Sequence, residues 1–235
     1  MRFDRPLEEG VLLQRYKRFL ADVRRADGSV LTVHCPNSGA MTSCSEPGSR
    51  ALISDSENPK RKLRHTLEMV KSGRVWVGVN TANPNRAVAG WVGRGRIPEL
   101  VGYPELRREV PYGEEQRSRI DLRLRHQGER PDCYVEIKNA TLKVGEHAAF
   151  PDAVTERGRK HLLDLRGVVE QGERAVLFFF VGRSDCHRLR PADEVDPAYG
   201  ETLREVAAAG VELLAYRMRF GRRRIELLNR LPVDL

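Results

Sequence analysis

Residues 118–138, SRIDLRLRHQGERPDCYVEIK, contain two runs in which apolar and polar side chains alternate. Successive side chains of a strand point to opposite faces of a sheet, so each run predicts a strand with one buried face. A polar turn around Gly128-Glu129 separates the two runs and predicts a β-hairpin. The predicted strands are Ser118–Arg125 and Cys133–Lys138, and their apolar positions are Ile120, Leu122, Leu124, Cys133, Val135 and Ile137.

The other face of this hairpin carries charged residues. If the hairpin is symmetric about its turn, facing residues have numbers that sum to 257, which places Asp121 opposite Glu136. Arg119 then faces Lys138 on the same side of the sheet. Paired side chains have Cβ atoms about 4.5–5.5 Å apart, and a slip of one residue would turn the apolar face to water. We therefore expect two carboxylates and a lysine on one patch of sheet.

This arrangement of charges suggests a metal site. Facing carboxylates repel each other, and Mg²⁺ is typically held by one or two carboxylates together with water and phosphate oxygens. We expect Asp121 and Glu136, with the Ile137 carbonyl, to bind Mg²⁺ or Mn²⁺. Lys138 would stabilise the attacking hydroxide or contact the scissile phosphate, as metal-assisted phosphodiester hydrolysis requires. The same spacing also fits a solvated outer face, on which neighbouring arginines neutralise the acids.

The chain around the hairpin predicts strands mixed with helices. Ala175–Val181, AVLFFFV, is a continuous apolar run typical of a strand covered on both faces. The segment Val154–Gln171 has the apolar stripe of a helix, and a second helix is predicted over Tyr199–Ala209. Further strands are predicted over Arg107–Tyr112, Val211–Phe220 and Arg224–Leu228. The pattern predicts an α/β domain over residues 86–235, with a central mixed sheet flanked by helices.

The first third of the chain predicts short strands between turns. They are Leu12–Val23, Val30–His34, Arg50–Ser54 and Val75–Val79. A turn at Asp27-Gly28 joins the first two into a hairpin. Such spacing fits a small β-barrel of oligonucleotide-binding (OB) type over residues 1–85, although a β-sandwich fragment has the same periodicity. The segment Asn83–Gly95 is rich in Gly, Pro and Asn and is the expected domain junction.

Basic residues are concentrated toward the N-terminus. The whole chain has a net charge of +8, and residues 1–86 account for 15 basic and 9 acidic side chains. Such an excess favours a polyanionic partner, nucleic acid before a membrane surface. Only seven of the 41 basic residues are lysine, so an arginine-rich composition without any such partner also fits.

Three groups of basic residues are candidate nucleic-acid contacts. Residues 15–19, RYKRF, interleave bases with aromatic rings, which suits phosphate contact and base stacking, although a strand with a buried Tyr16 fits equally. Residues 59–65, PKRKLRH, suit a loop that follows a phosphate backbone, although such runs are often simply solvated. The third group lies on the hairpin and on the helix after it, where Lys160 could instead pair with Glu156. The candidates are Arg15, Lys17, Arg18, Lys60, Arg61, Lys62, Arg64, Arg119, Arg157 and Lys160.

Several strings resemble a known family. Asp121, followed after a hairpin by Glu136-Ile137-Lys138, resembles the core of PD-(D/E)xK nucleases. More narrowly, five strings are similar to the sugar fermentation stimulation protein A (SfsA) family. They are LLQRYKRFLADV at 12–23, HCPNSGAM at 34–41, SRIDL at 118–122, YVEIKNATL at 134–142 and FPDAVTERG at 150–158.

The resemblance implies an OB-type barrel joined to a restriction-endonuclease-like α/β domain, in a bacterial or archaeal cytoplasmic protein that binds DNA and is linked to sugar-utilisation genes. It also implies that Glu109, upstream of Asp121, is a third carboxylate of the site, although Glu109 could equally be a surface residue between arginines. Catalysis does not follow from the family alone, because a nuclease fold can be kept for binding only. The Pro-Asp dipeptide of the core is altered here, since Ile120 precedes Asp121.

Other classes of cofactor and partner are not expected. His34, Cys35, Cys44 and His65 do not have the spacing of a structural zinc site, and the four cysteines show no disulfide pattern. Cys133 and Cys186 are expected to be small core residues. We expect no organic cofactor and no membrane partner, and a homodimer is compatible with the sequence.

The sequence therefore predicts a protein that binds DNA without sequence preference and carries an Mg²⁺- or Mn²⁺-dependent nuclease site. The alternative is a non-catalytic DNA-binding regulator of sugar-utilisation genes, in which the nuclease fold is vestigial. Barrels of this type bind either DNA or RNA, so the sequence does not distinguish a DNA partner from an RNA partner.

Overall fold

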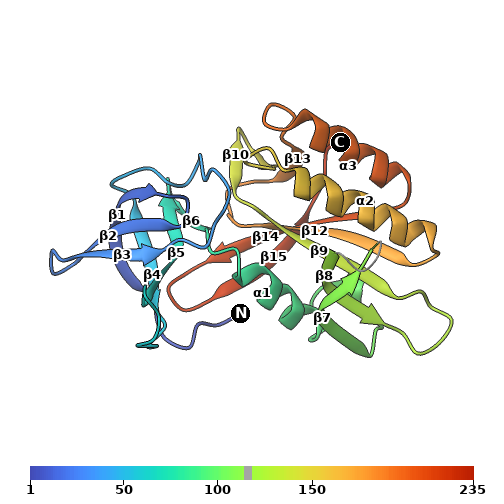
Figure 1. Ribbon diagram of the computed structural model, residues 1–235, viewed down its shortest axis with the longest axis horizontal. Helices are drawn as coiled ribbons and strands as arrows, with labels where there is room; N and C mark the ends of the chain where they lie inside the picture. Colours follow the sequence, from blue (N-terminus) through green and yellow to red (C-terminus); the bar gives the residue numbers. More distant parts are fainter. Residues whose placement is uncertain (114–117) are drawn as a thin grey trace.

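The computed structural model describes residues 1–113 and 118–235. Figure 1 shows a barrel built from the first part of the chain beside a larger unit of sheet and helices. The barrel strands are β1 (Glu8–Tyr16), β2 (Leu20–Arg25), β3 (Val30–His34), β4 (Arg50–Asp55), β5 (His65–Ser72) and β6 (Val75–Gly78). The second unit contains α1 (Asn83–Val92), a 3₁₀ turn (Pro98–Leu100), β7 (Glu105–Tyr112), β8 (Ser118–Arg125), β9 (Cys133–Ala140), β10 (Leu142–Val144), β11 (His147–Phe150), α2 (Glu156–Glu170), β12 (Arg174–Val181), β13 (Arg188–Pro191), α3 (Pro197–Ala208), β14 (Glu212–Phe220) and β15 (Ile225–Leu231).

The N-terminal sheet closes on itself as a barrel. Its strand order is β3-β2-β1-β4-β5-β6, and a parallel bridge between His34 and Thr66 joins β3 to β5. Apolar side chains such as Leu12, Val33 and Leu67 fill the interior and are fully buried. The prediction of an OB-type barrel is confirmed.

Two features of the barrel differ from the prediction. The segment predicted as one strand, Leu12–Val23, is a hairpin in which β1 and β2 pair across a turn at Lys17 and Arg18. These two residues have φ angles of 46° and 63°, a conformation that usually requires Gly or Asn, so the sequence gives no turn signal there. Strand β5 was not predicted from the sequence. Five successive residues in it are buried, so buried and exposed positions do not alternate along it.

The expected junction segment folds largely as helix α1. Pro84 stands in its first turn, where a missing N–H costs no helical hydrogen bond. Ala87, Val88 and Trp91 form its buried face, and the Trp91 ring stacks on Phe180 of β12 at a centroid distance of 6.1 Å. The helix is therefore fixed to the sheet of the second unit.

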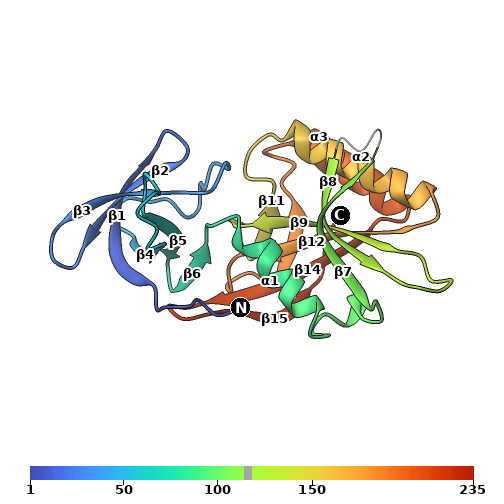
Figure 2. The same ribbon diagram turned by 60° about the horizontal axis from the view of Figure 1, so that its bottom comes forward.

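The second unit is the expected α/β domain. Its sheet has the order β15-β14-β12-β9-β8-β7, with β12 parallel to both of its neighbours. Helices α2 and α3 cover one face of this sheet and α1 lies on the other (Figure 2). Phe178 and Phe180 of β12 pack on the side of α1, whereas Leu177 and Phe179 pack on the side of α2 and α3. The predicted strand buried on both faces is confirmed.

The β8–β9 hairpin has the predicted register over its hydrogen-bonded part. Leu122 pairs with Val135, Arg123 with Tyr134 and Leu124 with Cys133. These pairs end at Leu122 and Val135, which are the immediate neighbours of Asp121 and Glu136 in the sequence. Asp121 and Glu136 therefore lie where the two strands begin to separate, which leaves room for side chains from other elements.

Short elements complete the domain. Strands β10, β11 and β13 form a small second sheet, and each has only three or four residues, too few for a periodic pattern. Cys133 and Cys186 are fully buried, as expected for core residues. In the described part of the chain, no helix is both long and apolar enough to cross a membrane.

The first residues of the chain lie along the β14–β15 hairpin of the second domain. The amino group of Met1 donates to the Ile225 carbonyl at 2.8 Å, and the Ile225 N–H donates to the Met1 carbonyl at 2.8 Å. The Phe3 N–H and the Leu7 N–H also donate to carbonyls of the turn that joins β14 to β15. The N-terminal segment thus connects the barrel to the opposite end of the sequence.

Candidate active site

Three predicted residues meet at the splayed end of the β8–β9 hairpin. Asp121 comes from β8, and Glu136 and Lys138 come from β9. They share a cleft of about 330 Å³ with side chains of α1, α2 and β7. Glu136 is only 3% exposed, so these groups do not lie on a solvated outer face. The alternative of a merely solvated charged strand face is wrong.

Glu136 is held by two nitrogen groups, and both contact the same carboxylate oxygen. Lys138 Nζ donates to Glu136 Oε1 at 2.7 Å, and His161 Nδ1 contacts the same oxygen. Lys138 Nζ also lies 3.2 Å from His161 Nδ1. Burial raises the pKa of Glu136, but the neighbouring Lys138 and the His161 hydrogen bond outweigh it and hold that pKa below its usual value. Glu136 is therefore a carboxylate.

The second oxygen of Glu136 has no hydrogen-bond partner. Glu136 Oε2 is buried, and none of the described residues donates to it. A buried carboxylate oxygen without a partner is costly, and such an atom in a protein usually marks an ion, a water or a functional role. This orphaned acceptor is the feature of the site that fits a metal ion.

Asp121 accepts two hydrogen bonds. The Ile137 N–H donates to Oδ2 at 2.7 Å, and Asn85 Nδ2 donates to Oδ1 at 2.5 Å. Burial and the nearby Glu136 charge raise the pKa of Asp121 to about 7. Two carboxyl groups compete for negative charge here, which is the electrostatic signature of a site that a cation would relieve. The Ile137 group seen at Asp121 is its amide, and a metal-binding role for its carbonyl stays a prediction.

Helix α2 brings His161 into the cleft. Thr155 caps the helix, since its side chain accepts a hydrogen bond from the Gly158 N–H at 3.0 Å. A Cβ atom on Gly158 would lie 2.7 Å from Thr155 Cγ2, so the cap requires glycine there. Arg157, in the first turn, donates to His161 Nε2 at 3.4 Å and lines the cleft.

Glu109 lies at the edge of the same cleft. On β7 it stands between Arg108, which pairs with Leu122, and Val110, which pairs with Ile120, and is therefore level with Asp121. Its φ angle is 53°, which is unusual for a residue within a strand. Its carbonyl accepts a hydrogen bond from Arg119 at 3.1 Å. The side chains of Glu109 and Arg119 both line the cleft.

The number of metal ligands is small. Within residues 1–113 and 118–235, no group of three or more His, Cys, Asp or Glu side chains is arranged to hold a metal ion. The acids that are in place, Asp121 and Glu136, leave most of a coordination shell to water and phosphate oxygens. That is the way in which proteins commonly hold Mg²⁺.

The basic residues predicted near the N-terminus fall on two loops of the barrel. Lys17 and Arg18 are exposed at the tip of the β1–β2 turn. Arg15 is different: its guanidinium donates to the carbonyls of Asn37, Gly39 and Ala40. Arg15 therefore holds a loop in place, and its assignment as a free phosphate contact is corrected.

The run after Pro59 forms the β4–β5 loop. Lys60 and Lys62 are exposed. Arg61 donates to Thr66 Oγ1 at 3.2 Å, and Arg64 forms two hydrogen bonds of 2.5 Å with Asp55. Only the two lysines of this run thus combine exposure with no ion pair among the described residues.

Lys160 is also occupied elsewhere. It donates to Ser118 Oγ at 2.5 Å and to Asp164 Oδ2 at 3.1 Å. The alternative partner on the helix, Glu156, is not the one observed. Lys160 does not line the cleft that holds Asp121.

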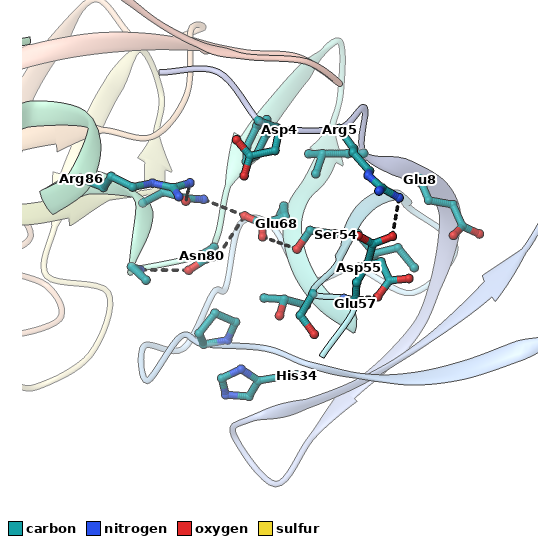
Figure 3. Close-up of a pocket in the computed structure, with 18 of the residues that line it drawn as sticks. Asp4, Arg5, Glu8, His34, Ser54, Asp55, Glu57, Glu68, Asn80 and Arg86 are labelled. Carbon is teal, nitrogen blue, oxygen red and sulfur yellow. Dashed lines mark hydrogen bonds and ion pairs between the residues drawn. The ribbon is translucent and has the colours of Figure 1, made fainter. Parts of the chain in front are cut away.

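A separate cleft of about 720 Å³ lies between the N-terminal segment and the barrel (Figure 3). Glu68 stands at its centre and is 5% exposed. Both of its oxygens are used: Ser54 donates to one at 2.6 Å, and Asn80 and Asn83 donate to the other at 2.9 and 2.7 Å. This acid stabilises the join between β5 and α1, and its charge is satisfied within the protein.

Two residues of the candidate site were not predicted from the sequence. Asn85 lies in the Gly-, Pro- and Asn-rich segment that indicated only a junction. His161 lies next to Leu162 on the apolar stripe of the predicted helix, and it is 9% exposed. A polar residue within the buried face of a helix was the available signal.

Comparison with known proteins agrees with this architecture. Residues 13–79 match the family model described as SfsA N-terminal OB domain, and residues 82–224 match the model described as sugar fermentation stimulation protein RE domain. The chain belongs to the SfsA family. Its resemblance to that family, inferred above from five strings, is confirmed.

Relatives in the SfsA family match over the full chain. A sugar fermentation stimulation protein homolog from Geobacter metallireducens is 52% identical over 235 residues, which is 100% of both chains. The homolog from Pelobacter propionicus is 54% identical over 230 residues, 98% of each. A solved structure, Pyrococcus furiosus SfsA in complex with Ca²⁺, has a TM-score of 0.89 at 26% identity and covers 100% of this chain and 98% of its own.

Proposed function

We propose that this protein binds DNA through its barrel and hydrolyses phosphodiesters with a divalent metal ion in the cleft of the second domain. The observation that carries the proposal is the meeting of Asp121, Glu136 and Lys138 in one recessed cleft. Two acids and an ammonium at one point are the components that metal-assisted hydrolysis uses. The order Asp, then Glu-x-Lys on the next strand, is that of PD-(D/E)xK nucleases.

The residues in place fit a hard divalent cation. Glu136 Oε2 is a buried acceptor with no donor among the described residues, and burial together with the Glu136 charge raises the pKa of Asp121. Oxygen ligands of this kind suit Mg²⁺ or Mn²⁺. The structure of the Pyrococcus furiosus relative was solved in complex with Ca²⁺, another cation that prefers oxygen ligands. Asp121 and Glu136 would hold the ion, with the Ile137 carbonyl as a proposed third ligand.

The bound ion would polarise the phosphate and lower the pKa of a water molecule. The chain's own residues position the reactants. Lys138 Nζ, fixed by Glu136 and His161, is placed to orient the attacking water and to compensate charge on the phosphate. Arg119 and Arg157 line the cleft and would contact flanking phosphates. The water oxygen forms a bond to phosphorus and loses a proton as one ester P–O bond breaks, and the departing oxygen takes up a proton.

The barrel supplies the binding surface. In OB folds, the loops between strands 1 and 2 and between strands 4 and 5 flank the face that binds oligonucleotides. Four exposed basic residues lie on those two loops: Lys17 and Arg18 on the first, Lys60 and Lys62 on the second. Contacts of this kind are made to phosphate and give binding without sequence preference.

Incubation of plasmid and single-stranded DNA with the protein and Mn²⁺ tests the nuclease. Wild-type protein should cleave, and the double variant Asp121→Ala/Glu136→Ala should not. Mn²⁺ should also raise the melting temperature of the wild type but not of the double variant. Cleavage that survives in the double variant would refute the assignment of the site.

A non-catalytic binder is the second candidate, and one observation favours it. Both oxygens of Asp121 already accept hydrogen bonds, from Asn85 and from the Ile137 N–H. An acid satisfied in this way can be kept for structure alone, in a regulator that retains the fold without its reaction. Retention of DNA without cleavage, and without thermal stabilisation by Mn²⁺, would select this candidate.

A further inference from the structure

The candidate active-site cleft continues beyond Lys138. A second cavity of about 250 Å³ lies beside it and shares Thr81, Asn85 and Lys138 with its lining. One part of this cavity is lined by β9 and the segment before α2, and another by Asn37–Gly39 from the barrel. The two cavities adjoin along these shared residues, and the second reaches the barrel; we call the two together the interdomain groove.

The barrel's side of this groove is fixed in position. The Arg15 guanidinium donates to the carbonyls of Asn37 and Gly39 at 2.8 and 2.9 Å. The Met41 N–H donates to Asp152 Oδ2, across the groove's end, at 3.0 Å. A Cβ atom on Gly39 would lie 2.3 Å from Asp152 Oδ1, so the loop and the second domain are in close contact. The groove is therefore closed at this end and cannot widen without breaking these bonds.

The reacting groups lie deep in the groove. Glu136 is 3% exposed and His161 is 9% exposed. The cleft is small, about 330 Å³, whereas a B-DNA duplex is wide, since its major groove alone measures about 12 Å across. A duplex can rest on the mouth of such a cleft, but a single strand can enter it.

The barrel offers an exposed ring near its basic loops. Phe19 is 46% exposed and follows Lys17 and Arg18 on the β1–β2 turn. Its neighbour Leu20 pairs with His34, and His34 also bridges to Thr66 at the end of the β4–β5 loop. Through His34, the end of the β1–β2 turn and the end of the β4–β5 loop thus lie on neighbouring strands, and the turn carries an exposed aromatic side chain. Stacking of unpaired bases on such rings, between basic loops, is a means of binding single strands.

We propose that the interdomain groove binds a single strand of nucleic acid and that the loop Asn37–Gly39 excludes the complementary strand of a duplex. This inference rests on the proposed function and specifies its substrate class: a free single-stranded region or end. Ser38 and Thr81, both exposed and both lining the second cavity, contact the nucleotide next to the scissile phosphate.

Substrate structure gives the first test. End-labelled oligonucleotides of one sequence are supplied with Mn²⁺ as a single strand, as a blunt duplex and as a duplex with a single-stranded overhang. The single strand and the overhang should be cut at least about tenfold faster than the blunt duplex. Equal or faster cleavage of the blunt duplex would overturn the inference.

Binding without metal gives a second, independent test. In EDTA, Ser38→Trp should weaken the binding of a labelled single-stranded oligonucleotide several-fold, because the indole occupies the groove. Thr42→Trp is the matched control, since Thr42 is exposed in the same loop region but lines neither cavity, and it should leave the affinity unchanged. Equal effects of the two substitutions, or no effect of Ser38→Trp, would remove the loop from the binding path.

A small diester separates failure of this inference from failure of the proposed function. Bis(p-nitrophenyl) phosphate needs no groove, so its hydrolysis by the wild type and by the control variant Thr42→Trp reports on the metal site alone. Hydrolysis of this diester together with rapid cutting of blunt duplex would support the nuclease proposal and refute the single-strand groove. If the wild type hydrolyses no phosphodiester at all, the nuclease proposal fails. The oligonucleotide affinities of the two variants then show by themselves whether the groove binds a single strand.

Discussion

At the scale of single residues, the site depends on a carboxyl group whose surroundings oppose its charge. Burial of Asp121 against α1 and β9, and after it the charge of the neighbouring Glu136 carboxylate, raises the pKa of Asp121 to about 7. Alternation within the strands predicted that these side chains would share a face. It did not predict that α1 and α2 would cover that face, because burial by a distant element leaves no mark on the strand's own pattern.

This raised pKa makes the stability of the metal-free protein depend on pH. The folded state keeps a proton on Asp121 that the unfolded state, with a pKa near 3.8, has already released, so the stabilisation is lost as pH rises toward 7. In EDTA, the free energy of unfolding of the wild type should fall by about 2 kcal/mol relative to Asp121→Asn between pH 5 and pH 7. Urea unfolding at the two pH values measures it, and a difference independent of pH would contradict the raised pKa.

At the scale of elements, the predicted parts of the fold are those with a regular pattern. The hairpin of β8 and β9, the buried strand β12 and the helices α2 and α3 each have enough residues to show their period. The β1–β2 turn and β5 lack such signals, the first because lysine and arginine adopt positive φ angles, the second because it is buried on both faces. Likewise, sequence identified the basic β4–β5 loop but not the ion pair that engages Arg64.

That difference within the β4–β5 loop yields a prediction. Lys60→Glu/Lys62→Glu should weaken binding to nucleic acid of any sequence, and the slope of log affinity against log salt should shrink by about one for each phosphate that a lysine no longer neutralises. Salt titrations of a labelled oligonucleotide measure both effects. Arg94→Glu/Arg96→Glu changes the net charge equally at exposed positions of the second domain and is the control. An equal decrease of affinity in both variants would mean that net charge, not this loop, carries the binding.

At the scale of the whole molecule, the two domains are joined by more than their connecting segment. The first residues of the chain pair with β15 and with the turn before it, and the Met41 amide is bonded to Asp152. Hydrogen bonds between residues so far apart in the sequence leave no local pattern, so the sequence predicted two domains and not how they are fastened together.

Removal of residues 1–6 should therefore destabilise both domains together. The deletion removes the bonds of Met1 and Phe3 to the β14–β15 hairpin and uncovers Ile225, which is 1% exposed in the intact chain. The melting temperature should fall by several degrees, in keeping with a decrease of about 1–2 kcal/mol in the free energy of unfolding. Deletion of the exposed C-terminal Leu235 serves as the control and should change it little. An unchanged melting temperature after the first deletion would show that the N-terminal segment contributes nothing to stability.

The pairing of Met1 with Ile225 also has a consequence for the order in which the protein is made. Residues 1–3 leave the ribosome well before β15, the strand that receives them. The barrel can close early, whereas its leading segment must wait, unpaired, until β15 has been synthesised. A nascent chain stalled before residue 225 should accordingly expose its first residues to protease, and they should become protected only once β15 has emerged.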